Sequence, residues 1–472
     1  MKRIVFMTII LLLFAVSFIS CSVIPDIFTI NKLPEKVDEK FSAADDGDFF
    51  FAISVSGGGS RAAVWTSSVL YELYKEVKLP DGRSVLDEVD YISCVSGGSL
   101  ASAYYCMRKP VVDTREKKEY DIFFDNYTED MRRNFEKEIV SIYKPWQWKR
   151  VFLKATDKGV ILQRVFDRML TERGTKNFRD LHERQLKVQC PTIIINGTVM
   201  DNGSKFLFTT LRRSDFLFNT FSKTEVPEET AAAWEYILPV KEEEGAMFAG
   251  DIGQSIGNMR VSRAVMGSAS IPLLFGPIII EGETKKMPGK MTYFHINDGG
   301  IADNLGLETV IQLMLNRFSD PNKRYRGGLV LIIDAGHLID PKDSTCSIEE
   351  FTTGKILGRS LDIFDYRHKY FIYYNILLLQ QNPAFRNVRF VYLSPYLPYL
   401  KDKDNGNDED NCSDKDNDKD KDNGEKELKK IGTRFKIDPK SAKLLDDLAK
   451  EVVGDMKETI LLNFEGKDAP RK

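Results

Sequence analysis

The chain has 472 residues, of which 42% are hydrophobic and 29% charged, so it can bury one large core or two smaller ones. A formal net charge of -3 gives no overall basic field and argues against a nucleic-acid partner. Six cysteines without a CxxC pair are too few for a disulfide scaffold, and four widely spaced histidines leave little for a metal site.

The first residues, 1–20, have the pattern of an export signal. Lys2 and Arg3 precede an apolar run over 4–19. This run has roughly 16 residues, fewer than the ~20 that cross a bilayer comfortably. Residues 18–21 (Phe-Ile-Ser-Cys) resemble a bacterial lipobox, which implies that Cys21 is the lipidated N-terminus of a membrane-anchored lipoprotein in the bacterial cell envelope. The alternatives are an ordinary cleaved signal peptide and an uncleaved anchor, and all three export the chain.

Past this signal we expect a tether, one domain and a tail. The polar segment 21–47 has no sustained period and indicates a tether. The domain is expected over 48–465, because Asp438 and Pro439 can start a helix that returns to it. Inside it, the Asp-, Asn- and Lys-rich tract 401–428 predicts a disordered insertion, and residues 466–472 are the tail. A calcium loop is disfavoured in the insertion because Lys403 and Lys421 fall at ligand positions.

Two strand-turn-helix units begin the domain. A short apolar run at 49–56 predicts a strand, three glycines break it, and apolar positions recur at helical spacing over 61–74. A second unit follows, with a strand at 89–95, a turn at 96–99 and a helix from 100 to 107. Such tandem units imply parallel strands with crossover helices, hence an α/β sandwich with some antiparallel pairing. Further strands are expected at 192–200, 205–210, 277–281, 291–296, 328–335 and 388–393.

Ser96 is a candidate nucleophile. It stands where a strand is expected to end and a helix to begin, and a tight turn there exposes the hydroxyl while small neighbours let strand and helix approach. The residues Cys94-Val95-Ser96-Gly97-Gly98 fit GxSxG except that Cys94 replaces the first glycine. The motif is weak by itself, since glycine and serine after a strand commonly form only a turn.

The earlier glycine loop, 56–61, is a candidate anion site. It leaves backbone N–H groups free at a helix N-terminus, and in acyl transfer such donors stabilise the tetrahedral oxyanion. Arg61 can add positive charge or fix the loop. A dinucleotide site is the competing interpretation, because Gly57, Gly59 and Ala62 fit GxGxxG/A. It is disfavoured because the second strand ends in Val95-Ser96-Gly97, where a dinucleotide site would have an acidic residue.

Asp298 is a candidate base. It lies on a glycine turn directly after an expected strand, in the segment 295–300. A carboxylate in this position can reach the mouth of a parallel sheet, where functional loops gather. An Asp-Gly-Gly turn alone is commonly only a turn.

Together these three segments resemble the patatin-like phospholipase family. The glycine-rich loop at 57–62, the elbow at Ser96 and the Asp-Gly-Gly turn at Asp298 occur in the order of that family. Residues 191–210 and 263–272 also look like its strand pair after the elbow and its helix leading to a proline. The resemblance covers 49–335 and implies a three-layer α/β/α sandwich around a mostly parallel sheet.

The resemblance also implies an activity. Ser96 would be the nucleophile and Asp298 the base of a two-residue dyad. The oxyanion hole would be formed by Gly57, Gly58 and Gly59, with Arg61 in support. The implied reaction is hydrolysis of a lipid acyl ester, of phospholipase A or lysophospholipase type, through an acyl-enzyme on the serine. The substrate would be membrane lipid or another acyl ester, with no cofactor and no metal.

Two other functions remain open. A serine esterase of the α/β-hydrolase type would add His337 or His368 to Ser96 and Asp298 as a third catalytic residue. A lipid-binding lipoprotein would keep the fold without activity. The aromatic and cationic run 143–150 is typical of interfacial segments, and a solvated helix face is the alternative interpretation.

Overall fold

The structure is a computed structural model that describes residues 30–31, 48–142, 155–171, 177–187, 189–218, 245–272, 275–283, 288–319, 325–337, 339, 353–400 and 419–464. The expected signal peptide, Cys21, nearly all of the tether, the run 143–150, most of the charged insertion and the tail lie outside the described residues. In the described part, no helix combines the length and the apolar content needed to cross a bilayer.

One mixed, mostly parallel sheet forms the centre of the molecule, in the order β1-β7-β8-β4-β3-β2-β9-β10. The strands β4, β3, β2, β9 and β10 run parallel, whereas β8 is antiparallel to β4 and β7 is antiparallel to β8. Off this path, β5 pairs antiparallel with β4 and parallel with β6. The bounds are β1 Ile30–Asn31, β2 Phe49–Val55, β3 Tyr91–Val95, β4 Thr192–Val199, β5 Lys205–Phe208, β6 Met247–Phe248, β7 Ile278–Gly282, β8 Thr292–Asp298, β9 Gly327–Ile333 and β10 Val388–Leu393.

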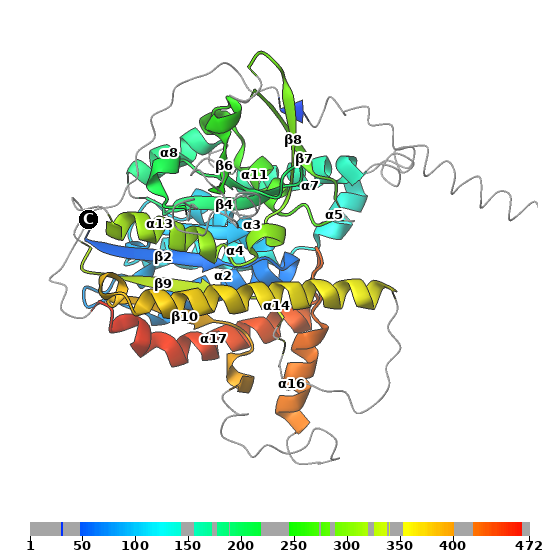
Figure 1. The fold of residues 1–472 in the computed structure, drawn as a ribbon. Coiled ribbons are helices and arrows are strands. Elements are labelled where there is room, and N and C mark those ends of the chain that lie inside the picture. Colours follow the sequence, from blue (N-terminus) through cyan, green and yellow to red (C-terminus); the bar gives the residue numbers. More distant parts are fainter. Residues whose placement is uncertain are drawn as a thin grey trace, which may run out of the picture.

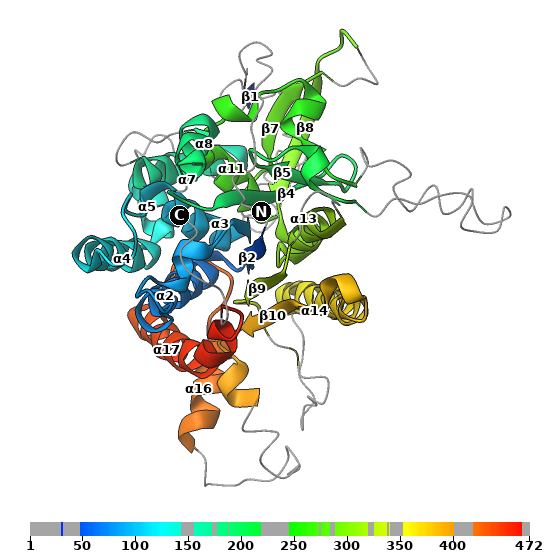
Figure 2. The same ribbon diagram turned by 90° about the vertical axis from the view of Figure 1, so that its left-hand side faces the viewer.

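The central strands are buried on both faces, which explains their nearly continuous apolar sequences. Helices cover both faces, so the expected three-layer α/β/α sandwich is confirmed. Figure 2 shows α14 and α17 on opposite sides of β10. The described α-helices are α2 Gly59–Glu76, α3 Ser96–Arg108, α4 Lys117–Met131, α5 Phe135–Ile142, α7 Ala155–Leu170, α8 Phe178–Leu186, α11 Val261–Ser268, α12 Gly300–Asp303, α13 Leu307–Ser319, α14 Thr353–Gln380, α16 Lys419–Lys430 and α17 Pro439–Leu461.

Each of the two faces has its own apolar core. The side chains of α2, α3 and α17 pack on one face, where Phe51 and Ile53 of β2 point. The side chains of α13 and α14 pack on the other face, against the alternate β2 residues Phe50 and Ala52. Successive side chains of a strand point to opposite faces of the sheet, so β2 contributes residues to both cores.

The charged tract departs from the sequence-based expectation at its C-terminal end. We expected disorder over 401–428, yet α16 occupies Lys419–Lys430. Leu428 is fully buried in the core that contains α17, and Lys429 pairs with Glu425 at 3.0 Å, one turn earlier. The buried leucine and the ion pairs at helical spacing therefore stabilise a helix that the charged composition of the tract did not predict.

Candidate active site

Ser96 lies at the sharp turn between β3 and α3. Its φ of +50° is the only positive value among the described non-glycine residues. A side chain in this left-handed region costs free energy and persists only where the surroundings hold it. The main-chain N–H of Ser96 donates a 2.8 Å hydrogen bond to Oγ of Ser268, at the end of α11. This contact fixes the turn that presents the Ser96 hydroxyl.

The hydroxyl of Ser96 donates directly to a carboxylate. Ser96 Oγ lies 2.9 Å from Oδ2 of Asp298, the last residue of β8, and both side chains are buried. Oδ1 of Asp298 accepts from the N–H of Gly300 at 2.8 Å. Burial raises the pKa of Asp298 from 3.8 to about 6, although the Gly300 and Ser96 hydrogen bonds oppose this rise. A carboxylate with this pKa can accept a proton from the serine and return it near neutral pH.

One short segment holds both members of this pair. Besides the bond from Ser96 to Ser268 Oγ, the carbonyl oxygen of Ser268 accepts from the N–H of Gly299 at 3.2 Å. The carbonyl oxygen of Ser270 accepts from the N–H of Asp298 at 3.3 Å. Residues 268–270 therefore set the distance between the elbow and the Asp-Gly-Gly turn.

The glycine loop connects β2 to α2 beside this pair. Gly58 and Gly59 have φ of +139° and +61°, which explains the glycines. A Cβ on Gly97, at the start of α3, would lie 1.9 Å from the carbonyl oxygen of Gly59, so the first turns of α2 and α3 touch. Both helices thus direct their N-terminal N–H groups toward one region, as an oxyanion requires.

Two N–H groups of this loop have partners within the protein. The N–H of Gly57 donates to the carbonyl oxygen of Asn304 at 2.9 Å, so the structure contradicts its predicted role as an oxyanion donor. The N–H of Ser60 donates to the carbonyl oxygen of Arg434 at 2.7 Å. Gly58 and Gly59 remain as candidate donors from the predicted set.

The guanidinium of Arg61 bonds to residues outside the Ser96–Asp298 pair. Its guanidinium is buried, which lowers its pKa, and Nη1 donates to the carbonyl oxygen of Ile431 at 2.7 Å. The same nitrogen contacts Nε2 of His337, whose Nδ1 lies 3.0 Å from the hydroxyl of Tyr396. Of the two roles considered for Arg61, these contacts favour fixing the loop.

The histidines lie apart from the serine-carboxylate pair. His337 contacts Arg61 and Tyr396, and burial lowers its pKa to about 3, so it is neutral at physiological pH. His295 pairs with Asp201, and His182 contacts Gln185. The structure describes all four histidines, and none of them forms a hydrogen bond with Ser96 or Asp298. The geometry therefore gives no support to a three-residue triad.

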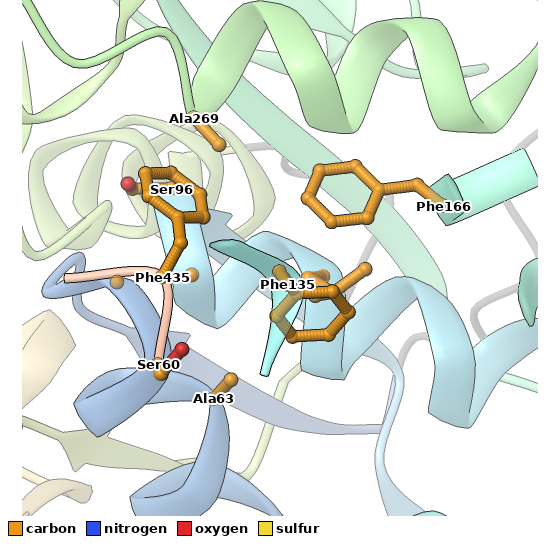
Figure 3. Close-up of a pocket in the computed structure, with 10 residues that line it drawn as sticks. Ser60, Ala63, Ser96, Phe135, Phe166, Ala269 and Phe435 are labelled. Atoms are coloured by element: carbon orange, nitrogen blue, oxygen red, sulfur yellow. The ribbon is translucent and has the colours of Figure 1, made fainter. Parts of the chain in front are cut away.

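A small apolar pocket lies beside Ser96, with a cavity volume of about 10 Å³. Figure 3 shows Ser60 and Ser96 on one side of it and the rings of Phe135 and Phe166 on the other. The Ser60 hydroxyl is buried and has no hydrogen-bond partner among the described residues. The pocket is lined by Gly59, Ser60, Ala63, Ser96, Gly97, Leu100, Phe135, Phe166, Ala269 and Phe435. The lining therefore suits an apolar chain next to a polar end, once the cavity has widened to admit one.

Sequence reasoning missed the contributions of Ser268 and of the segment 431–435. Ser268 stands in a segment noted only as a helix leading to a proline, and its bond to Ser96 spans 172 positions. Phe435 follows the charged tract and lines the pocket. The only signal in the sequence for this contribution was the apolar aromatic side chain of Phe435, which stands close to a charged tract.

The layered α/β fold holds a serine hydroxyl against a buried carboxylate. Two helix N-termini and an apolar pocket lie beside this pair. This is the arrangement of a candidate acyl hydrolase. Residues 53–311, more than half of the chain, match the family described as patatin-like phospholipase. The chain belongs to the patatin-like phospholipase family.

Among solved structures, human GIVD cytosolic phospholipase A2 matches with 11% identity and a TM-score of 0.48, over 90% of this chain and 61% of that one. The same human protein in complex with methyl gamma-linolenyl fluorophosphonate matches with 12% identity and a TM-score of 0.43, over 90% and 60% of the two chains. VipD from Legionella pneumophila matches with 10% identity and a TM-score of 0.30, over 93% and 72%. No curated protein sequence matches the chain.

Proposed function

We propose that this protein is a lipid acyl hydrolase in which Ser96 is the nucleophile and Asp298 the general base. The observation that carries the proposal is the 2.9 Å hydrogen bond from Ser96 Oγ to Asp298 Oδ2. Membership of the patatin-like phospholipase family supports the substrate class. Phospholipase A and lysophospholipase activity are both compatible with such a pair.

The proposed reaction has two halves. Asp298 takes the proton of Ser96 as Oγ attacks the ester carbonyl carbon, and the N–H groups at the starts of α2 and α3 stabilise the oxyanion. The tetrahedral intermediate collapses, Asp298 returns the proton to the leaving alcohol, and the acyl group stays on the serine. Water, deprotonated by Asp298, then attacks the acyl-enzyme and releases the fatty acid, which restores the serine hydroxyl.

The apolar pocket would receive the acyl chain. The rings of Phe135, Phe166 and Phe435 suit a hydrocarbon, and the Ser60 hydroxyl can donate to an ester oxygen at the polar end. Pockets for small ligands commonly have volumes of about 300–1,000 Å³. The cavity here has only about 10 Å³, so an acyl chain would need the pocket to widen substantially. Phe435, on the irregular segment between α16 and α17, is the side chain best placed to move.

We further propose that Cys21 is lipidated and anchors the protein in a bacterial envelope membrane. The support is the sequence pattern of 1–21 alone. When the protein is expressed in bacteria that are fed a radioactive fatty acid, Cys21→Ala should abolish labelling of this protein. A mature chain that begins at another residue, or that carries no lipid, would contradict the proposal.

Reaction with a fluorophosphonate tests the hydrolase function. We expect covalent modification of one peptide, containing Ser96, identified by mass spectrometry, and loss of labelling in Ser96→Ala. Ser102→Ala is the matched control, because Ser102 is also buried on α3 but does not line the pocket. A folded protein that neither reacts at Ser96 nor hydrolyses any lipid ester would instead be a lipid-binding protein without activity.

A further inference from the structure

Helix α14 carries an exposed apolar face. Seven of its large side chains are exposed by 46–64%, although a soluble surface rarely gathers such residues. They recur at spacings of three, four and seven positions, so they share one face of the helix. The stripe consists of Ile363, Phe364, Tyr370, Phe371, Tyr374, Leu377 and Leu378.

The opposite face of α14 is already used by the fold. Ile372 and Ile376 are buried in the core that α14 shares with α13, and Lys369 is buried as well. Figures 1 and 2 show α14 at the periphery of the molecule. The stripe is therefore not required for the packing of this helix on the sheet.

The charges around the stripe have one sign. The exposed charged side chains of α14 between 359 and 380 are both arginines, Arg359 and Arg367. The two carboxylates in that range, Asp362 and Asp365, are only partly exposed. Within a chain of net charge -3, this region is locally cationic. Its electrostatic complement is an anionic surface.

We infer that the α14 stripe docks on the surface of an anionic lipid bilayer. This inference rests on the proposed function, which requires a substrate that resides in such a surface. Aromatic side chains with polar tips and arginines suit the boundary between headgroups and acyl chains. Arg367 stacks on Tyr370 and Phe371, with its guanidinium 5.3 and 5.6 Å from the two ring centres. Its charge would therefore lie level with the inserted rings.

A second copy of the chain is the less suitable occupant. In a two-fold dimer the same patch meets itself, so arginines would face arginines across an apolar contact. An anionic bilayer surface instead pairs those arginines with phosphates while the rings enter the acyl region.

The inner face of α14 connects the stripe to the candidate active site. Asp365 accepts from the side-chain amide of Asn304 at 3.0 Å, and the carbonyl of Asn304 holds the N–H of Gly57. Lys369 pairs with Asp334 at 2.8 Å and with Asp365 at 2.9 Å. Docking through α14 would thus bring the glycine loop close to the membrane.

A pair of double variants of the full chain tests the inference. Phe371→Asp with Leu377→Asp places two negative charges in the stripe. Ile122→Asp with Met291→Asp is the matched control, since both residues are apolar and similarly exposed elsewhere. All chains keep residues 1–47, so any membrane affinity of that segment is common to them. We would measure co-sedimentation with phosphatidylcholine vesicles, with and without phosphatidylglycerol, and turnover of a soluble short-chain ester.

The stripe variant should bind phosphatidylglycerol vesicles at least ~10-fold more weakly than the control, because two large apolar side chains no longer leave water. Arg367→Glu should weaken binding only when phosphatidylglycerol is present. Equal binding by the stripe variant and the control overturns the inference, as does a parent chain that is a dimer and becomes monomeric on Phe371→Asp with Leu377→Asp.

The two proposals can fail separately. Vesicle binding is also measured in Ser96→Ala, so docking is decided even if no ester is hydrolysed. Loss of soluble-ester turnover in Ser96→Ala tests the hydrolase function independently of any membrane.

Discussion

The main-chain N–H of Ser60 donates a 2.7 Å hydrogen bond to the carbonyl oxygen of Arg434. This bond ties the glycine loop to the segment 431–435, which also receives Arg61 at the carbonyl of Ile431. Phe435 of the same segment lines the pocket, and its carbonyl accepts from the N–H of Phe135 at 3.0 Å. The segment 431–435 therefore contacts both the glycine loop and the pocket, and it connects the C-terminal part of the domain to the candidate site.

Gly59→Ala should disrupt this contact. The new Cβ would lie 2.4 Å from the Arg434 carbonyl oxygen, and the φ of +61° is already unfavourable for alanine. We expect a loss of about 2–4 kcal/mol in the free energy of unfolding, together with lower turnover. Gly82→Ala separates the two causes, because Gly82 has φ of +86° but no atom within 4 Å of the added Cβ. Equal loss of stability in the two variants, measured by denaturant unfolding, would show that the contact contributes nothing.

Ser96→Ala and Asp298→Asn should each lower kcat by at least ~10⁴-fold, and the double variant should be no worse than either one. The reason is that nucleophile and base act as a unit, so their effects do not add. Thermal melting checks that all three chains remain folded. Near-normal turnover in a single variant would remove that residue from the proposed dyad.

The pKa of Asp298 predicts the pH dependence of activity. The base must be ionised, so turnover should fall as the pH falls through about 6. This value lies close to that of an imidazole, so the acid limb alone does not distinguish aspartate from histidine. The pH dependence of turnover should stay the same when each histidine is replaced. A shift of the acid limb in a histidine variant would argue against Asp298 as the base.

The same pKa predicts how stability changes with pH. A carboxyl with a folded-state pKa above its unfolded value holds its proton longer in the folded state. Its contribution is complete below pH 3.8 and is lost as the pH rises through about 6. The folded protein should thus lose up to roughly 3 kcal/mol relative to Asp298→Asn over this interval. Unfolding of both chains from pH 4 to 7 measures the difference, and parallel curves would contradict the raised pKa.

Ser268→Ala tests the positioning of the nucleophile. The N–H of Ser96 would lose its side-chain acceptor, and the strained turn would be held less firmly. We expect kcat to fall by about 10–100-fold with little change in KM, since substrate binding is not touched. Ser270→Ala is the control, because the Ser270 hydroxyl bonds only to the carbonyl of Met266 in the preceding turn. A proportional rise in KM would assign Ser268 to the binding of substrate.

His337→Ala and His368→Ala should retain turnover within about tenfold of the parent, unlike removal of a triad member. His337 is engaged with Arg61 and Tyr396, so its loss should act mainly on stability. Collapse of activity in either folded variant would favour the α/β-hydrolase type of esterase after all.

The sequence was sufficient for features encoded next to each other in the chain. Both strand-turn-helix units occur as expected, because glycines directly after buried apolar runs leave little choice. The pattern also pointed to Ser96 and Asp298, whose oxygens lie 2.9 Å apart although 202 positions separate the residues. Because β8 runs antiparallel to β4, it is the pairing register that brings them together: β4 pairs Gly197 with Asp298 and the adjacent Asn196 with Val95, next to Ser96.

Features that depend on a distant partner could not be predicted in this way. Gly57 looked like an oxyanion donor because its N–H is free in an isolated loop, and only the fold reveals the Asn304 carbonyl that accepts from it. The helix α16 was not predicted because its segment is largely charged and a single buried leucine stabilises it. Neither partner has a local signature.

The hydrogen bond from Arg61 to Ile431 joins residues 370 positions apart, nearly the whole length of the domain. Closing a chain loop of this size costs entropy that only a largely formed fold can offset. The strands β2, β3, β4 and β8 can pair while the protein is still being synthesised. The glycine loop can acquire its backing only after residues 431–434 have been synthesised and have reached it, so the site cannot be completed before almost the whole domain exists.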